Sequence, residues 1–212
     1  AMPSLRFALP ALALALLLAP ASPADACGNE VERVVDTTNQ AIRAASDLLA
    51  RGHHRSAARV VANTFPRILE ANHSTRRQEL FTRGQQIVAL AIVRSDGDLK
   101  LPGLPGKTAA DREVALAWAA GTLRLHVARG DRKVVLRSEL AEALAHRPAE
   151  HHEAREILAE LAETDIIPTA RAWRILADLE RERGDHEAAT RATLRCKDIS
   201  SDPQDCSPNP VS

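Results

Sequence analysis

Apolar residues recur at helical spacing along most of this chain. In residues 29–50, for example, Val31, Val34, Ala41 and Ala45 fall on one stripe of a helix. Such spacing predicts amphipathic helices, whose apolar stripe packs against neighbouring elements. Comparable patterns predict helices over residues 29–50, 57–65, 74–93, 109–128, 132–146, 150–163, 170–183 and 186–196. Because one helix follows another, we expect an all-α fold.

Glycine and proline mark the breaks between these helices. Residues 95–107 hold three glycines and two prolines, which makes them the clearest loop in the sequence. Thr108 and Asp111 follow with the spacing of a helix capping box. Gly-Asp pairs at 130–131 and 184–185 predict the end of one helix and the N-cap of the next.

These breaks suggest a division of the chain into five parts. We expect a signal peptide in 1–26, an N-terminal helical region in 27–94, a Gly/Pro-rich loop in 95–108, a helical array in 109–197 and a Pro/Ser-rich tail in 198–212. One continuous fold bridged by a long loop is an equal alternative.

Two of the predicted helices carry more specific expectations. Gly84 should weaken the helix of residues 74–93 slightly, because glycine has a low helix propensity. The helix of residues 109–128 has apolar residues on two faces, with Val114 and Leu125 on one of them. We therefore expect this helix to lie between neighbours on both sides.

The N-terminus has the pattern of a signal peptide. Arg6 precedes an apolar core, residues 7–18, and the segment 24–26 reads Ala-Asp-Ala, a small-residue cleavage site. The apolar run is shorter than the roughly 20 residues that a spanning helix needs. We expect a bacterial protein that is exported to the periplasm or secreted, with its mature chain starting near Cys27.

Three cysteines would remain after cleavage, and an odd number leaves one without an intramolecular partner. Disulfides persist outside the cytoplasm, and Cys196 and Cys206 are the nearest pair in sequence. We predict that they pair and fix the tail to the last helix. Cys27 is either lipidated, which would anchor the protein to a membrane, or left by ordinary signal cleavage as a free thiol or bridged to Cys196 or Cys206.

Composition narrows the classes of partner. Lys+Arg and Asp+Glu both total 28, so the formal net charge is zero, and aromatics make up only 2% of residues. This balance argues against nucleic acid or an anionic membrane as the main partner. Alanine is abundant, with 39 residues, which suits close-packed helices.

The motifs of common catalytic sites are missing from the sequence. It has no nucleophile elbow and no H-x-x-x-H or H-E-x-x-H spacing. Histidines nevertheless recur near the turns, at His53, His54, His146, His151, His152 and His186. We therefore predict a non-enzymatic protein without a cofactor or metal, and keep a histidine-based metal-binding or metalloenzyme-like helical envelope protein as the alternative.

The segment 170–196 resembles a tetratricopeptide repeat (TPR). The matching positions are Trp173, Leu176, Ala177, Gly184 and Ala189. Similar turns occur near residues 52 and 149, and the last two copies are 35 residues apart, close to the 34-residue TPR period. The resemblance implies a short α-solenoid of stacked antiparallel helix pairs, in which these five residues pack the repeat.

The resemblance also implies a mode of action. TPR-like proteins bind protein segments on a concave surface made by the first helix of each pair. In the last repeat the positions facing that surface would be Arg171, Arg174, Asp178 and Arg181. Arginines there suit a partner with carboxylates. We therefore predict an exported, non-enzymatic interaction module or scaffold of the bacterial cell envelope.

Overall fold

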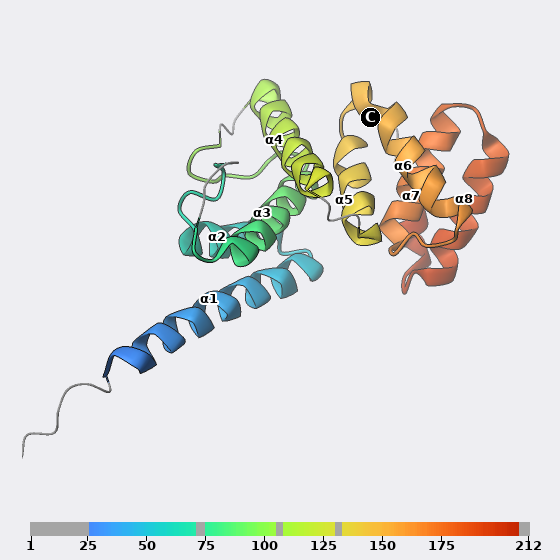
Figure 1. Cartoon of the computed structure of the whole chain (residues 1–212). Coiled ribbons are helices and arrows are strands. Elements are labelled where there is room, and N and C mark those ends of the chain that lie inside the picture. Colours follow the sequence, from blue (N-terminus) through green and yellow to red (C-terminus); the bar gives the residue numbers. More distant parts are fainter. Residues whose placement is uncertain (1–25, 71–74, 105–107, 130–132, 208–212) are drawn as a thin grey trace, which may run out of the picture. The chain divides into compact units, whose positions relative to one another are not determined.

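The structure is a computed structural model that describes residues 26–70, 75–104, 108–129 and 133–207, with side chains from residue 37 onward. Within these ranges it is helical and contains no strand. Figure 1 shows the helices in chain order. Their bounds are α1 Ala26–Ala50, α2 His54–Thr64, α3 Gln78–Val93, α4 Ala109–Ala128, α5 Val134–Leu144, α6 His151–Glu163, α7 Ala170–Glu182 and α8 His186–Ile199, with short 3-10 turns η3 Pro148–Glu150 and η4 Pro203–Cys206. The predicted all-α fold is confirmed.

The chain divides into two compact units, residues 1–37 and 38–212. The described part of the first unit is the beginning of α1. The predicted signal peptide lies almost wholly outside the described residues, and Cys27 lies in α1 where side chains are not described.

Each helix from α2 to α8 packs against the next one along the chain. In addition, α3 contacts α5 and α5 contacts α7, so these three helices form a connected row, which we call the odd-numbered row. The loop of residues 95–108 joins α3 to α4, and these two helices pack directly against each other.

Small residues allow the helices to approach closely. A Cβ atom on Gly84 of α3 would lie 3.0 Å from Val61 Cγ1, 3.2 Å from Ile68 Cδ1 and 3.5 Å from Ile42 Cδ1. Gly84 therefore has a packing role that offsets its low helix propensity. Buried alanines, such as Ala57 of α2, occupy similar close contacts elsewhere in the core.

We predicted that neighbours cover α4 on both sides, but two apolar residues on one of its faces are exposed. Val114 is 53% exposed and Leu125 44% exposed. The neighbours of α4 are α3 and α5, so its buried stripe faces them and the opposite side meets solvent. Trp118 is half-buried at the edge, and its indole N–H donates to the Leu69 carbonyl at 2.9 Å.

The predicted helix caps that fall in the described residues are present. Thr108 accepts a hydrogen bond from the Asp111 N–H at 3.1 Å, and Asp111 accepts one from the Thr108 N–H at 3.0 Å. Gly184 ends α7 with a φ of +86°, and Asp185 accepts from the Ala188 N–H at 2.9 Å to begin α8. The other predicted Gly-Asp turn, at residues 130–131, lies outside the described residues.

The predicted Cys196–Cys206 disulfide is present. The two Cα atoms are 5.8 Å apart, and both cysteines are buried. The bond joins the last turns of α8 to the end of η4, and η4 packs against both α7 and α8. The first part of the predicted tail is therefore attached to the helical array.

Candidate interaction surface

A buried carboxylate joins three helices of the odd-numbered row. Glu142 of α5 accepts two hydrogen bonds from Arg94, which follows α3, from Nε at 3.0 Å and from a terminal nitrogen at 3.1 Å. Arg171 of α7 places its Nε 3.6 Å from the same carboxylate, beyond hydrogen-bond distance. The Glu142 side chain is 6% exposed, Arg94 is 18% exposed and Arg171 is 44% exposed.

A second carboxylate lies one helical turn earlier. Glu139 accepts a hydrogen bond from the side-chain amide of Gln86 on α3. Burial raises the pKa of Glu139 to about 6, with the Gln86 hydrogen bond and Arg94 opposing the rise and Glu142 adding to it. We call Arg94, Glu139, Glu142 and Arg171 the Glu142 cluster.

The arginines of the Glu142 cluster differ in how well their charge is matched. Burial disfavours the charge of Arg94, but its hydrogen bonds to Glu142 and the nearby carboxylates outweigh this and raise its pKa. Burial lowers the pKa of Arg171, and repulsion from Arg94 and Arg174 lowers it further against the attraction of Glu142 and Asp205. The guanidinium of Arg171 is thus less fully compensated than that of Arg94.

A histidine from α2 borders the same cluster. Burial lowers the pKa of His54, and the positive charges of Arg94 and Arg171 lower it further. The Glu142 carboxylate and a hydrogen bond with the backbone of Arg94 act in the opposite direction. Groups from α2, α3, α5 and α7 therefore meet at this position.

The structure separates the four surface residues predicted on α7 into two groups. Arg171 and Arg174 are near the Glu142 cluster, since both enter its electrostatics. Asp178 and Arg181 pair with each other at 2.6 Å, and Arg181 also reaches Thr193 of α8 at 3.5 Å. Only the first two are therefore associated with the surface that contains Glu142.

The five residues that we predicted to define a repeat lie in or beside the α7–α8 hairpin. Trp173, Leu176, Ala177 and Ala189 are buried, and Gly184 is the turn. Glu180 of α7 is also buried. Its carboxylate is 3.6 Å from a guanidinium nitrogen of Arg155 and 3.2 Å from one of Arg183, and this pairing compensates its charge.

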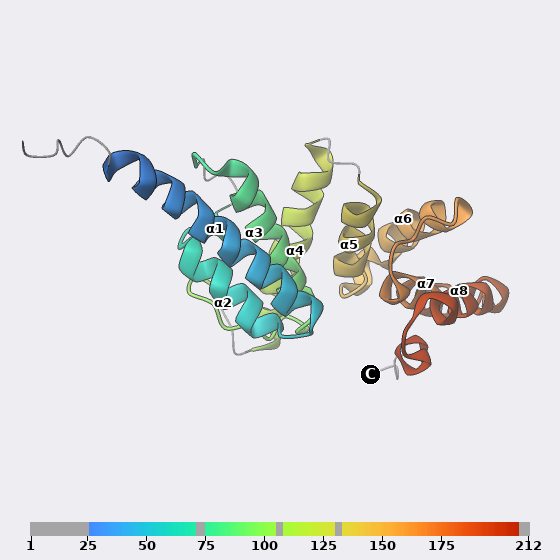
Figure 2. The same ribbon diagram turned by 90° about the horizontal axis from the view of Figure 1, so that it is seen from below.

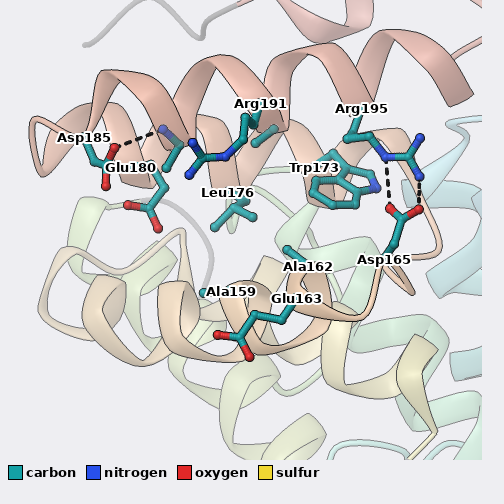
Figure 3. Close-up of a pocket in the computed structure, with 12 residues that line it drawn as sticks. Ala159, Ala162, Glu163, Asp165, Trp173, Leu176, Glu180, Asp185, Arg191 and Arg195 are labelled. Atoms are coloured by element: carbon teal, nitrogen blue, oxygen red, sulfur yellow. Dashed lines mark hydrogen bonds and ion pairs between the residues drawn. The ribbon is translucent and has the colours of Figure 1, made fainter.

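A groove of about 510 Å³ runs between α6 and α8, over the apolar side chains of Trp173 and Leu176. Figure 3 shows Arg195 and Asp165 together at one end of the groove, beside Trp173. The Arg195 guanidinium carbon is 5.8 Å from the Trp173 ring centroid. The charges at that end of the groove are therefore neutralised within the protein.

The candidate histidines lie apart from one another or pair with acids. His151 Nδ1 is 2.9 Å from Glu182, His146 Nδ1 is 3.3 Å from Asp96 and His152 Nε2 is 3.3 Å from Glu156. His53 and His186 are exposed. Across the described residues, no group of three or more His, Cys, Asp or Glu side chains is placed to hold a metal ion.

Sequence reasoning did not single out Arg94, Glu139 or Glu142. Glu139 and Glu142 are spaced three apart within the apolar helix α5, next to buried Leu140 and Ala143. Two carboxylates inside so apolar a segment are a usable signal, because a buried carboxylate requires a partner. The sequence does not identify Arg94, 48 residues away, as that partner.

Comparisons with known proteins give no relative from which to transfer a function. No family model, curated protein or solved structure matches this chain. In the part of the chain that the structure describes, no helix is long and apolar enough to cross a membrane.

Proposed function

We propose that this chain is a non-enzymatic, TPR-like interaction module of the bacterial cell envelope, which binds a carboxylate-bearing protein segment through α7. The observation that carries the proposal is the state of Arg171. Arg94 already binds Glu142 through two hydrogen bonds, whereas Arg171 lies 3.6 Å away and is 44% exposed. A guanidinium has five N–H donors, and a partner carboxylate could accept two of them in parallel.

The arrangement of the helices supports an α-solenoid. Sequential helices pack together, and the contacts α3–α5 and α5–α7 link every second helix. In a stack of helix pairs, the first helices of successive pairs form one continuous surface. Under this proposal α3, α5 and α7 are those first helices, and the Glu142 cluster lies along the surface they make.

Electrostatics supports an acidic partner. The Arg171 pKa is lowered by burial and by repulsion from Arg94 and Arg174, so a nearby negative charge would stabilise the arginine. The zero net charge of the whole chain gives no long-range preference for polyanions, so recognition would depend on local pairing. Such binding should weaken as salt is added.

The experiment is a titration with a synthetic peptide that carries four consecutive Asp or Glu residues, compared with its Asn/Gln counterpart. We expect the wild type to bind the acidic peptide and the Arg171→Gln/Arg174→Gln variant to bind it at least about tenfold more weakly, roughly 1.4 kcal/mol. Glutamine avoids placing a new carboxylate beside Glu142.

The matched control is Arg59→Gln/Arg191→Gln, which removes two exposed arginines from α2 and α8. It should bind like the wild type. The proposed function would be overturned if both double variants lost affinity for the acidic peptide equally. It would also be overturned if the wild type bound the acidic and amide peptides equally well. Circular dichroism checks that the variants retain the wild-type helix content.

Export is a separate part of the proposal, supported by the signal-like sequence of residues 1–26. The intact mass of the protein recovered from a bacterial envelope tests it. A mass matching a chain that starts at Cys27 supports simple cleavage, and an added diacylglyceryl mass supports a lipid anchor. A chain that retains residues 1–26 would contradict export by this route.

A further inference from the structure

The segment that follows α8 packs against α7, the helix that the proposed function uses. Residues 200–207 turn back, and η4 packs against α7 and α8 (Figure 2). The Cys196–Cys206 disulfide holds this turn in place, and both of its cysteines are buried. Asp202 caps η4 by accepting from the Gln204 N–H at 2.9 Å, which fixes the local shape of the turn.

This return brings an acidic side chain toward α7. Asp205 directly precedes the disulfide cysteine Cys206 and is exposed. Its carboxylate is among the charges that act on Arg171, and it favours the charged form of that arginine. The turn after α8 thus places a negative charge within electrostatic range of Arg171, the side chain that the proposed partner would bind.

We propose that η4 is a built-in acidic competitor for Arg171, and that the Cys196–Cys206 disulfide keeps it in position. This inference rests on the proposed function, because it concerns regulation of the same surface. While the bond is intact, Asp205 is present at a high effective concentration, so an incoming acidic segment must displace it. The oxidised protein is then the weaker binder.

Reduction releases the competitor. A dithiol reductant donates two electrons, the Sγ–Sγ bond breaks, each cysteine ends as a thiol, and the reductant becomes a disulfide. The freed tail keeps its local cap at Asp202 but loses the covalent closure to α8. Its effective concentration at α7 falls, and an acidic partner should bind more tightly.

The test measures the affinity of the acidic peptide described above for the full chain in four forms. These are the oxidised wild type, the wild type reduced with dithiothreitol, the Cys196→Ser/Cys206→Ser variant and oxidised Asp205→Asn. We expect the last three to bind three- to tenfold more tightly than the first. Asp198→Asn, which removes another exposed acidic charge near the C-terminus, is the control and should bind like the wild type.

The outcomes separate the two proposals. If no form binds the peptide, the proposed function fails. If the wild type binds but Asp205→Asn has no effect, the competitor role is overturned while the proposed function stands. If Asp205→Asn binds more tightly but reduction and the double serine variant do not, the disulfide has no part in the regulation. Because Asp205→Asn leaves the disulfide intact, this arm does not depend on how well the reduced protein folds.

Discussion

At the scale of single residues, Glu142 is a buried carboxylate held by groups from neighbouring parts of the fold. It is buried between helices, and its charge is tolerated because Arg94 binds it with two hydrogen bonds. Such pairs are weak evidence for net stability, but removing one partner is costly because the other charge is left buried. Glu142 therefore links the stability of the fold to the proposed binding surface.

The Glu142→Gln substitution should destabilise the protein. The amide cannot compensate the charge of Arg94, which is only 18% exposed. We expect the free energy of unfolding to fall by about 3 kcal/mol, as measured by urea denaturation. Glu163→Gln, at an exposed position on α6, is the control and should change it by less than about 0.5 kcal/mol. A similar small effect at both positions would contradict the structural role of Glu142.

Glu139 should make stability depend on pH. Its folded-state pKa, about 6, is above the ordinary value of 4.5, so the folded protein binds this proton more tightly than the unfolded chain. The resulting stabilisation is fully present below pH 4.5 and is lost as the pH rises through about 6. For a side chain with some solvent access we expect the loss to be about 1–2 kcal/mol.

The measurement compares urea denaturation of the wild type and Glu139→Gln at pH 4.5 and pH 7.5. The difference in free energy of unfolding between the two proteins at each pH cancels the contribution of the other titrating groups. The variant should gain stability relative to the wild type as the pH rises. A constant difference between the two proteins would show that Glu139 titrates normally.

Sequence reasoning succeeded for residues whose environment is set by local pattern and failed for those set by distant partners. Cys196 and Cys206 are ten residues apart, and their pairing followed from proximity and compartment. From the sequence alone, a glutamate such as Glu142 is expected at the surface. It can be buried because Arg94, which is distant in sequence, compensates its charge. The predicted group on α7 divides for a similar reason, because Asp178 and Arg181 satisfy each other.

At the scale of elements, the apolar spacing was enough to predict where the helices lie. It was not enough to predict which faces of a helix are covered by neighbours. The α4 pattern predicted two covered faces, but the packing of α4 against α3 and α5 leaves Val114 and Leu125 exposed. Periodicity reports which residues favour burial, and the number of neighbouring helices decides how many of them are covered. Caps were predictable because their hydrogen bonds are local, as at Thr108 and Asp111.

Two helical glycines provide a matched pair for testing the packing of α3. A Cβ on Gly84 would press against Val61 and Ile68, whereas nothing lies within 4 Å of a Cβ on Gly121 of α4. We expect Gly121→Ala to raise the free energy of unfolding by about 0.5–1 kcal/mol, through the higher helix propensity of alanine. Gly84→Ala should lower it by about 1 kcal/mol, because overpacking outweighs that gain.

Thermal and urea denaturation of both alanine variants test this pair. The opposite signs are the prediction, since both substitutions make the same chemical change within a helix. Stabilisation by both variants would show that Val61 and Ile68 move aside without cost, and that α3 approaches α2 less tightly than described.

At the scale of the whole molecule, neutrality of charge does not mean an even distribution of charge. The chain has equal numbers of basic and acidic residues, yet Arg94, Arg171 and Arg174 gather near one carboxylate pair on the odd-numbered helices. Composition argues against polyanions as the main partner class, but it could not locate this local excess of positive charge. That location depends on the contacts between α3, α5 and α7, which are distant in sequence.

Hydrogen–deuterium exchange of the full chain, with and without saturating acidic peptide, locates the surface that binds the peptide. We expect slower amide exchange in the end of α3, in α5 and in α7, around Arg94, Glu142 and Arg171. Slower exchange confined to α6 and α8, along the groove over Trp173, would contradict this expectation, as would unchanged exchange throughout despite measured binding.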